Sequence, residues 1–340
     1  MSGDRWPRVE GMDIVVIGGT GHIGSHLVPQ LAAAGHGVTV LSRGHRRPYA
    51  SGLVWPGDVT NVVVDRDEQE AAGTFGTLVA DRQADVVVDL TCFTLDSARQ
   101  LTTALAAAPT PPHLLHCGSI WAHGASRVVP TTEESPRRPH TAYGKAKVAI
   151  EEHLLALSRA GDLPCTVVHP GHISGPGWVP VGPSGNVDVG VFAALAAGET
   201  VALPDQGLAT LQHVHAADVA GVFAAAIERP EAAVSESFHA VADGALTLLG
   251  YAEAVARWWG REALVELQPL PVWSEHVAPE HVATTVDHLT HSPHCSMDKA
   301  ADLLGFRPLH TGLETVREAV AALADEGQLP PLTDAVASRG

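Results

Sequence analysis

Cysteine is scarce in this sequence of 340 residues. The four cysteines, Cys92, Cys117, Cys165 and Cys295, are too few to form a disulfide framework in so long a chain. Cys92, Cys117 and Cys165 stand among apolar residues, and we expect all three to be small buried side chains.

Long apolar runs are also missing. No segment approaches the roughly 18 consecutive apolar residues that a membrane span requires. The first residues, MSGDRWPRVEG, lack the apolar region of a signal peptide. We therefore expect a soluble, cytoplasmic protein that does not bind membranes.

Basic residues are few, with 21 Lys and Arg against 38 Asp and Glu, and the formal net charge is −17. Such a surface repels a phosphate backbone, so nucleic-acid binding is not expected. The acidity itself indicates solubility rather than a particular partner.

Strand and helix signals alternate along the first half of the chain. Short Val/Ile/Leu runs are typical of strands that are buried on both faces. Strands are expected at 13–19, 37–42, 61–65, 84–90, 113–117 and 165–170, and helices at 25–34, 97–108 and 143–160. This order predicts an α/β fold, a Rossmann-type doubly wound parallel sheet with a smaller C-terminal substrate-binding lobe.

The pattern changes after Gly171. The segment GHISGPGWVPVGPSGN is rich in Gly and Pro and predicts a long loop. Later helices are expected at 189–197, 216–228, 248–259, 296–304 and 312–325. We assign residues 12–172 to a dinucleotide-binding domain with a returning segment at about 208–245, 173–207 and 246–325 to the substrate-binding lobe, and 1–11 and 328–340 to mobile tails.

A glycine-rich turn follows the first expected strand. In VVIGGTGHIGSHL, Gly18, Gly21 and Gly24 lie between a strand and a helix, and Gly19, Gly21 and Gly24 fit the G-x-G-x-x-G form. Glycine here permits a tight turn, close approach to a pyrophosphate and close packing of helix on strand. The position at the start of a βαβ unit favours dinucleotide binding over an ordinary turn.

The residues after the second strand favour NADP over NAD. An NAD-binding domain usually has an acid about 20 residues after the glycines, where it binds the ribose hydroxyls. This chain has Ser42-Arg43-Gly44 there, with Arg46 and Arg47 close behind and no acid before Asp58. Arginines suit a 2′-phosphate; the alternative is that they belong to a solvated loop.

Tyr143 and Lys147 are four residues apart in AYGKAK, so on a helix both project from one face. A free tyrosine has a pKa near 10, which is too high for a good base at neutral pH. A lysine ammonium and an oxidised nicotinamide would both favour the phenolate. Y-x-x-x-K alone is common by chance, and its value here comes from following the glycine turn and Ser119.

In this order and spacing the chain resembles the extended short-chain dehydrogenase/reductases, often called NAD-dependent epimerase/dehydratase proteins. The resemblance covers about residues 12–308. It rests on GGTGHIG, Ser119 five residues before Gly124, YGKAK, HPGHISGPG in place of the family's R-P-x-x-x-x-G-P segment, HVHAADVA and LGFRP.

The resemblance implies roles for the matching residues. Ser119 would hydrogen-bond the substrate oxygen, Tyr143 would exchange its proton, and Lys147 would hold the nicotinamide ribose while hydride moves between the substrate carbon and C4 of the ring. Asp65 resembles the family's adenine-contacting acid, with Asp58 as the competitor. A homodimer through helices flanking the sheet is also implied. The expected cofactor-binding residues are Gly18, Thr20, Gly21, His22, Ile23, Gly24, Ser42, Arg43, Arg46, Asp65, Arg66, Leu90, Thr91, Lys147, His169, Gly171 and Ile173.

Two departures from the family pattern narrow the reaction. Sugar-nucleotide dehydratases carry an Asp-Glu pair just after the serine position, and Ile120 and Trp121 cannot replace that acid and base. Relatives that act on nucleotide sugars hold the diphosphate with basic residues. Where the family commonly has Arg-Asp, this chain has Leu211 and Gln212. Dehydration and a nucleotide-sugar substrate are therefore disfavoured.

The second lobe is rich in His and Trp, which could line a pocket for a neutral, partly apolar substrate or simply pack in the core. The residues expected to contact substrate are Phe93, Ile120, Trp121, His172, Trp178 and His213. The segment HLTHSPHC, with His288, His291, His294 and Cys295, suggests a metal site, but the redox chemistry needs no metal and none is expected.

Three functional hypotheses remain. The leading one is an NADP-dependent oxidoreductase that interconverts a secondary alcohol and a ketone on a small, non-nucleotide substrate. The first alternative is an epimerase of a sugar or sugar-like substrate, in which hydride leaves and returns through a transient ketone. The second is a non-catalytic NADP-binding regulator, against which the intact Ser119, Tyr143 and Lys147 argue.

Overall fold

A seven-stranded parallel sheet forms the centre of the computed structural model, which describes residues 11–44, 55 and 59–333. The strand order is β11-β6-β5-β4-β1-β2-β3, and every neighbouring pair is parallel. The strands are β1 (Asp13–Ile17), β2 (Gly37–Ser42), β3 (Thr60–Val63), β4 (Val86–Asp89), β5 (His113–Cys117), β6 (Cys165–Pro170) and β11 (Ser237–Ala240). The predicted doubly wound α/β fold is confirmed.

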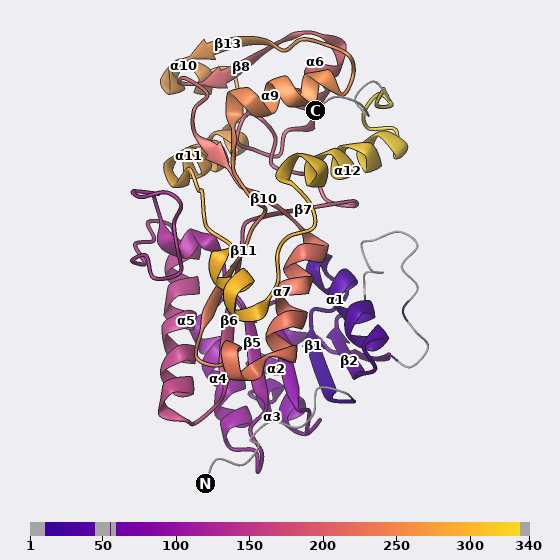
Figure 1. Cartoon of the computed structure of the whole chain (residues 1–340), viewed down its shortest axis with the longest axis vertical. Helices are drawn as coiled ribbons and strands as arrows, with labels where there is room; N and C mark the ends of the chain where they lie inside the picture. Colours follow the sequence, from indigo (N-terminus) through magenta and orange to yellow (C-terminus); the bar gives the residue numbers. More distant parts are fainter. Residues whose placement is uncertain (1–10, 45–54, 56–58, 334–340) are drawn as a thin grey trace.

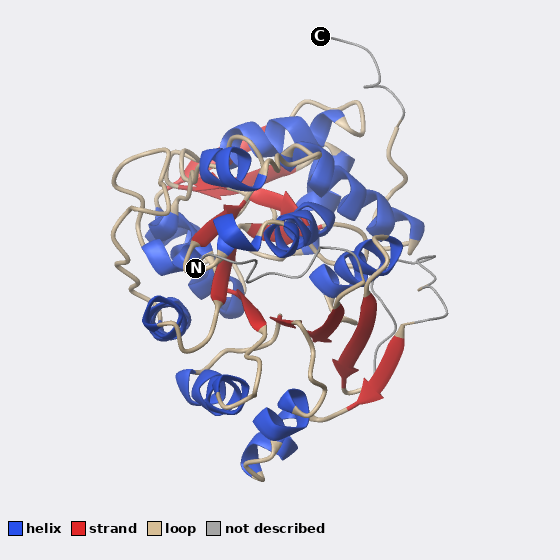
Figure 2. Cartoon of the chain, turned by 60° about the horizontal axis from the view of Figure 1, so that its bottom comes forward, coloured by secondary structure: helices blue, strands red, loops and turns tan. Residues whose placement is uncertain are grey.

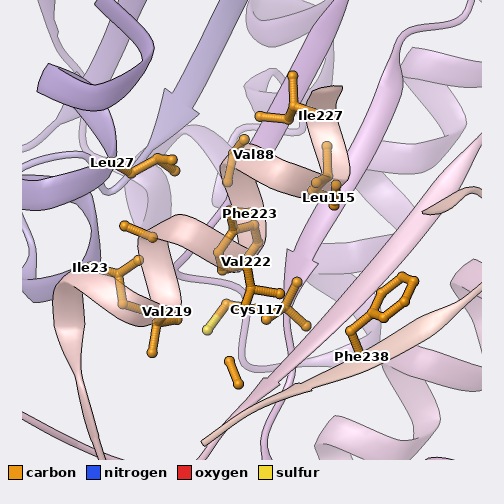
Figure 3. Packing of buried hydrophobic residues seen from close by; sticks show 14 of the residues in the cluster. Ile23, Leu27, Val88, Leu115, Cys117, Val219, Val222, Phe223, Ile227 and Phe238 are labelled. Atoms are coloured by element: carbon orange, nitrogen blue, oxygen red, sulfur yellow. The ribbon is translucent and has the colours of Figure 1, made fainter. Parts of the chain in front are cut away.

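Helices cover both faces of this sheet (Figure 2) because successive strand residues point to opposite sides. Val16 and Val88 face one cluster, which also holds Leu27 and Phe223 from the helices on that side (Figure 3). Val15 and Val87 face the other cluster. The first face is covered by α1 (His22–Ala33) and α7 (Ala216–Glu228), and the second by α3 (Phe75–Ala80), α4 (Leu95–Ala106) and α5 (Ala142–Ala160). Three short helices lie in the connections between these strands and helices: α2 (Arg66–Ala71), η1 (Ile120–His123) and α8 (Pro230–Ala233).

A smaller lobe lies at one end of the sheet (Figure 1) and has its own apolar cluster. It holds α6 (Val189–Ala197), β8 (Thr200–Pro204), α9 (Leu248–Arg257), β13 (Leu264–Gln268), α10 (Leu270–Ser274), α11 (Pro279–His291) and α12 (Gly312–Asp325). Two short ladders lie between lobe and sheet. They pair β7 (His172–Ser174) with β10 (His213–His215), and β9 (Thr210–Leu211) with β12 (Leu246–Thr247).

Residues 328–333 differ from the mobile tail that the sequence suggests from residue 328. Leu329 is 4% exposed. Trp259 Nε1 donates a hydrogen bond to the carbonyl of Pro330, and the Thr333 N–H donates to the carbonyl of Trp258. Residues 328–333 are thus packed, because two tryptophans far back in the sequence supply both an apolar surface and hydrogen-bond partners.

Three other segments differ from expectation. The Gly/Pro-rich segment after Gly171 contains β7, since a neighbouring strand is available for pairing. The helix expected at 296–304 spans residues 298–304 and ends in a π-helical turn, η2 (Ala300–Leu304), whose Ala300 and Leu304 pack in the cluster of α7 rather than in the lobe. The first half of the histidine-rich segment, His288–His291, forms the end of α11, a helix that the sequence reading missed, and the second half leads to the helical stretch at 298–304.

All four cysteines are buried with free thiols, as expected for Cys92, Cys117 and Cys165. Among the described residues, none of the helices combines the length and the apolar character that crossing a bilayer demands.

Candidate active site

The glycine turn lies between β1 and α1, and its glycines are required by contact. Gly18 has φ +85°, and a Cβ there would lie 2.4 Å from Cγ2 of Thr91. A Cβ on Gly24 would lie 2.5 Å from the Cα of Gly19, so α1 could not begin this close to the strand. These glycines leave the backbone of the turn free of side chains, as close approach of a pyrophosphate requires.

A cavity of about 370 Å³ opens beside this turn, at the carboxyl ends of β1 and β2. Its lining residues are Ile17, Gly18, Thr20, Gly21, Leu41, Ser42, Arg43, Val64, Arg66, Asp67, Phe75, Thr91 and Phe93. Ligands of open parallel sheets bind at carboxyl ends of strands. A larger hollow of about 790 Å³ lies at the opposite, amino ends and is lined largely by Ala and Pro; none of the predicted site residues lines it.

Arg66 is held rigidly at the edge of the cofactor cavity. Its guanidinium donates to Asp89 at 2.8 and 3.0 Å and to Glu70 at 2.6 Å, and it lies over the ring of Phe75. Nη2 is buried and has no hydrogen-bond partner among the described residues. A buried donor without a partner is costly, so this nitrogen fits a ligand acceptor. Arg43 is exposed and lines the same cavity.

Asp65 has a structural partner that the sequence reading did not foresee. Its carboxylate caps α2 by accepting the N–H groups of Asp67 and Glu68 at 3.0 and 3.3 Å. Both N–H groups bond to Oδ1 of Asp65. Arg66 lines the cavity and Asp65 does not. Arg46 and the competing Asp58 fall in stretches of the chain that the structure does not describe.

Lys147 is deeply buried on α5 and bridges two strand ends. Nζ donates to the carbonyls of Cys92 and Cys117 at 2.8 and 2.7 Å. It lies 4.7 Å from the ring centre of Phe93 and 5.8 Å from that of Tyr143. Burial lowers the pKa of the ammonium. Helix α5 begins at Ala142, directly before Tyr143, because Thr141 caps it. Thr141 Oγ1 accepts the hydrogen bond from the Gly144 N–H.

Ser119 and Tyr143 are brought together, as predicted. Burial raises the pKa of Tyr143 to about 12, and Cys117 adds to the rise, while a hydrogen bond with Ser119 opposes it. Tyr143 as a whole is 43% exposed, but its hydroxyl is directed at Ser119, which is 7% exposed. Ser119 Oγ accepts the Trp121 N–H at 3.2 Å, so its own proton is available to a substrate oxygen.

Of the residues after Ser119, only Trp121 faces the site. Its ring lies 6.3 Å from that of Tyr143, edge to face. Ile120 is 3% exposed and belongs to the core cluster of α1 and α7. The expectation that Ile120 contacts substrate is therefore corrected, because the short helix η1 turns it inward. Phe93, 56% exposed, lines the cofactor cavity beside Lys147.

An imidazole cluster adjoins Trp121 and includes residues the sequence reading did not assign to substrate. We define it as His172, His213, His288 and His291. The ring of Trp121 lies 4.0 Å from His291 and 5.3 Å from His288, and the ring of His172 lies 4.9 Å from His288 and 5.7 Å from His213. The spacing of the two helical members, three residues apart at the end of α11, is the signal that could have found them.

Burial keeps this cluster uncharged. It lowers the pKa of His213 to about 3, holds that of His172 well below its ordinary value, and lowers those of His288 and His291. Nε2 of His172, His213 and His291 is buried and lacks a hydrogen-bond partner in the described part of the chain. His291 Nδ1 donates to the Asp287 carbonyl at 2.8 Å, which leaves Nε2 as an acceptor for a ligand O–H or N–H.

The remaining predicted site residues lie near the cofactor cavity, near the imidazole cluster or in the adjoining core. His22 begins α1 and stacks on Trp178, with ring centres 5.1 Å apart. Leu90 and Ile173 are half-buried against the core. Gly171 lies against the Gln212 carbonyl, where a Cβ would come within 2.6 Å. His169 is buried away from the cofactor cavity, and Ile23 is in the core.

One group of described residues has metal-ligand spacing, His215, His310 and Glu318, with ligand atoms within 4.8 Å. His215 Nδ1 accepts the Ala217 N–H at 3.0 Å, so the neutral ring carries its proton on Nε2, 3.2 Å from Glu318. A proton in that place suits a contact with the carboxylate and not a metal bond.

Known proteins of one family resemble this chain in sequence. The family model "NAD dependent epimerase/dehydratase family" matches residues 14–240. A 2′-dehydrokanamycin reductase of Streptomyces kanamyceticus is 32% identical over 64% of this chain and 58% of its own length. A UDP-glucose 4-epimerase of Mycolicibacterium smegmatis is 28% identical over 62% of this chain and 72% of its own.

Among solved structures, an epimerase of Methanothermobacter thermautotrophicus superposes with a TM-score of 0.72 at 19% identity, covering 94% of each chain. That likeness concerns the fold. Two thirds of this chain matches the family model, and the glycine turn, Ser119, Tyr143 and Lys147 all lie within the matched residues. The chain belongs to the NAD dependent epimerase/dehydratase family, and the prediction of an NAD(P)-dependent enzyme is confirmed.

Proposed function

We propose that this protein is an NADP-dependent oxidoreductase that reduces a ketone to a secondary alcohol on a small polyhydroxylated substrate without a nucleotide. The observation that carries the proposal is the arrangement of Ser119, Tyr143 and Lys147. Lys147 Nζ holds the carbonyl of Cys92, which follows β4, and that of Cys117 at the end of β5, and the Tyr143 hydroxyl meets Ser119.

The residues present fit a nicotinamide dinucleotide. The bare turn at Gly18 and Gly24 would hold the pyrophosphate, and Arg66 Nη2 and Arg43 would meet acceptors at the adenosine end. When bound, the cofactor would supply the hydride. Lys147 lies one helical turn from Tyr143 and would orient the ribose.

Proton transfer is the task of this chain's own residues. Tyr143, with a pKa raised to about 12, is protonated at neutral pH and can give its proton to a ketone oxygen. Ser119 Oγ would donate a hydrogen bond to the same oxygen and stabilise the charge that develops there. The Lys147 ammonium stabilises the phenolate that remains.

The residues around Gln212 and the imidazole cluster favour a substrate without a diphosphate. Gln212 is 0% exposed and fully engaged, donating to Ala242 and Cys295 carbonyls and accepting the Cys295 N–H. Leu211 lies in the lobe core. Instead of cations, the imidazole cluster offers uncharged acceptors that suit hydroxyl and amino groups. The relative named as a 2′-dehydrokanamycin reductase is consistent with ketone reduction.

A substrate screen tests this function. Purified protein with NADPH would be assayed by nicotinamide absorbance against ketones of amino-substituted and hydroxylated rings and against UDP- and dTDP-sugars. We expect NADPH loss with a non-nucleotide ketone. Turnover of a UDP-sugar with no net absorbance change would instead establish the epimerase that the M. smegmatis relative suggests. Cofactor binding without any turnover would favour the regulator.

Arg43 provides a separate test of the cofactor. Arg43→Ala is expected to weaken NADP binding about 10- to 100-fold, the usual contribution of a charge-assisted hydrogen bond, and to leave NAD binding unchanged. Isothermal titration calorimetry would measure both. Arg99→Ala, at an exposed arginine on α4, is the matched control. Equal loss for the two cofactors, or none, would refute the assignment of NADP.

A further inference from the structure

A buried network lies behind Ser119, outside the cofactor cavity. Glu151 on α5 is 4% exposed, and His169 on β6 is 0% exposed. His169 Nε2 lies 3.1 Å from Glu151 Oε1. Arg137 donates to both oxygens of the same carboxylate, at 2.6 and 2.9 Å. Burial works against a charged carboxylate, but His169 and Arg137 outweigh it and hold the pKa of Glu151 far below its usual range.

The network ends on the backbone of Ser119. His169 Nδ1 lies 3.0 Å from both the amide nitrogen and the carbonyl oxygen of Ser119. The Ser119 N–H donates to Nδ1 on one side of the ring, and Glu151 Oε1 lies against Nε2 on the other side. Glu151 therefore fixes the orientation of the His169 ring from one side, and this orientation directs Nδ1 to the Ser119 N–H on the other side.

Gly118 shows how closely the ring approaches the chain. A Cβ at this position would lie 2.6 Å from His169 Nδ1 and 2.8 Å from its Cε1. The glycine directly before Ser119 thus makes room for the imidazole. The same strand end also supplies the Cys117 carbonyl that Lys147 holds, so Ser119 is constrained on both sides.

We propose that Arg137, Glu151 and His169 are positioning residues that fix the backbone of Ser119, so that its hydroxyl meets the substrate oxygen beside Tyr143. None of the three lines the cofactor cavity, and they act only through Ser119. The inference rests on the proposed function for its kinetic consequence, while its structural consequence, an ordered Ser119 amide, stands independently.

Substitutions at His169 provide the kinetic test. His169→Phe keeps a ring of similar shape but cannot accept the Ser119 N–H. We expect kcat to fall about 10- to 100-fold, the cost of a small misplacement of a reacting group, with the Kd of NADPH within twofold. His169→Asn, whose Oδ1 can accept the same N–H, is expected to recover at least half of the loss on a logarithmic scale. A rescue of this kind is not expected of a merely structural histidine.

Two further variants separate positioning from general damage. Glu151→Gln combined with His169→Phe is expected to be no slower than His169→Phe alone, because both act through one chain of contacts. His113→Phe, a buried histidine at the other end of β5, is the control and is expected to keep kcat within twofold. Additive effects, or an equal loss in His113→Phe, would contradict the proposal.

Amide hydrogen exchange of the peptide containing Ser119 gives a readout that needs no substrate. We expect slow exchange in the native protein, exchange at least tenfold faster in His169→Phe, and restored protection in His169→Asn. Unchanged exchange in His169→Phe would overturn the inference whatever the substrate is. If the native enzyme reduces no ketone but exchange responds as expected, the function fails and the positioning stands.

Discussion

Tyr143→Phe is expected to lower kcat for ketone reduction about 1000-fold, within the range observed when a general acid is removed. The variant loses only the hydroxyl whose proton the substrate oxygen would receive. The ring still lies edge to face with Trp121 and near Lys147, so the cofactor and substrate surroundings persist. Steady-state kinetics and NADPH binding, measured on the same preparation, are expected to show lost turnover with an unchanged Kd.

Tyr251 supplies the matched control, since Tyr251→Phe removes a hydroxyl from a buried tyrosine outside the cofactor cavity. Its hydroxyl donates to the Val181 carbonyl at 3.1 Å. We expect about 1 kcal/mol lower stability, the usual contribution of one hydrogen bond, and unchanged kcat. Comparable activity in Tyr143→Phe and the native enzyme would rule out the proposed proton donor.

Acidification below pH 6.5 is expected to destabilise the protein strongly, because many of its histidines are buried as uncharged rings. Burial lowers the pKa of His113 to about 4, and burial is likewise the largest cause that lowers the pKa of His213 to about 3. The unfolded chain binds protons from about pH 6.5 downward, while the folded chain does not. Stability is therefore complete above about pH 6.5 and is lost as the pH falls toward the folded-state pKa values.

Each such histidine is expected to cost about 2 kcal/mol between pH 6.5 and pH 5, from 1.36 kcal/mol per pKa unit. Urea unfolding at pH 7 and pH 5 would measure the total. His113→Phe is expected to reduce the difference between the two pH values by about 2 kcal/mol. Thr166, which contacts His113 Nε2, remains satisfied in this variant because its hydroxyl also donates to the Ala233 carbonyl.

The exposed His276 is the comparison, because an exposed imidazole is solvated in both states. His276→Asn is expected to leave the pH dependence of the urea midpoint as it is in the native protein. A native protein equally stable at pH 5 and pH 7 would contradict this prediction, because it would show that the buried rings bind protons in the folded protein as readily as in the unfolded chain.

Local spacing explains why the candidate catalytic residues can be found in the sequence. Tyr143 and Lys147 share a helix face through a four-residue spacing, and Gly18 and Gly24 mark a turn whose geometry depends on few neighbours. Ser119 lies two residues after the end of the strand HLLHC. These features are local, so the sequence pattern carries them.

Contacts between distant segments could not be predicted in the same way. Asp65 looked like an adenine contact, but whether its carboxylate turns to the helix α2 or to the cavity depends on the fold around it. In the sequence, Leu211 and Gln212 showed only that the family's Arg-Asp pair is missing, whereas in the structure the Gln212 amide joins two other segments. The histidines of α11 reach Trp121 only because the lobe folds over the sheet.

The sequence by itself determined the Rossmann-type sheet, the glycine turn and the order Ser119, Tyr143, Lys147, because strand periodicity and helix spacing are set by neighbouring residues. Only the tertiary structure decided which side chains surround that set, namely His169 behind Ser119 and the imidazole cluster beside Trp121, and that residues 328–333 pack on Trp258 and Trp259. The physical reason is that burial and hydrogen-bond partners come from residues 50 or more positions away, and no local pattern records them.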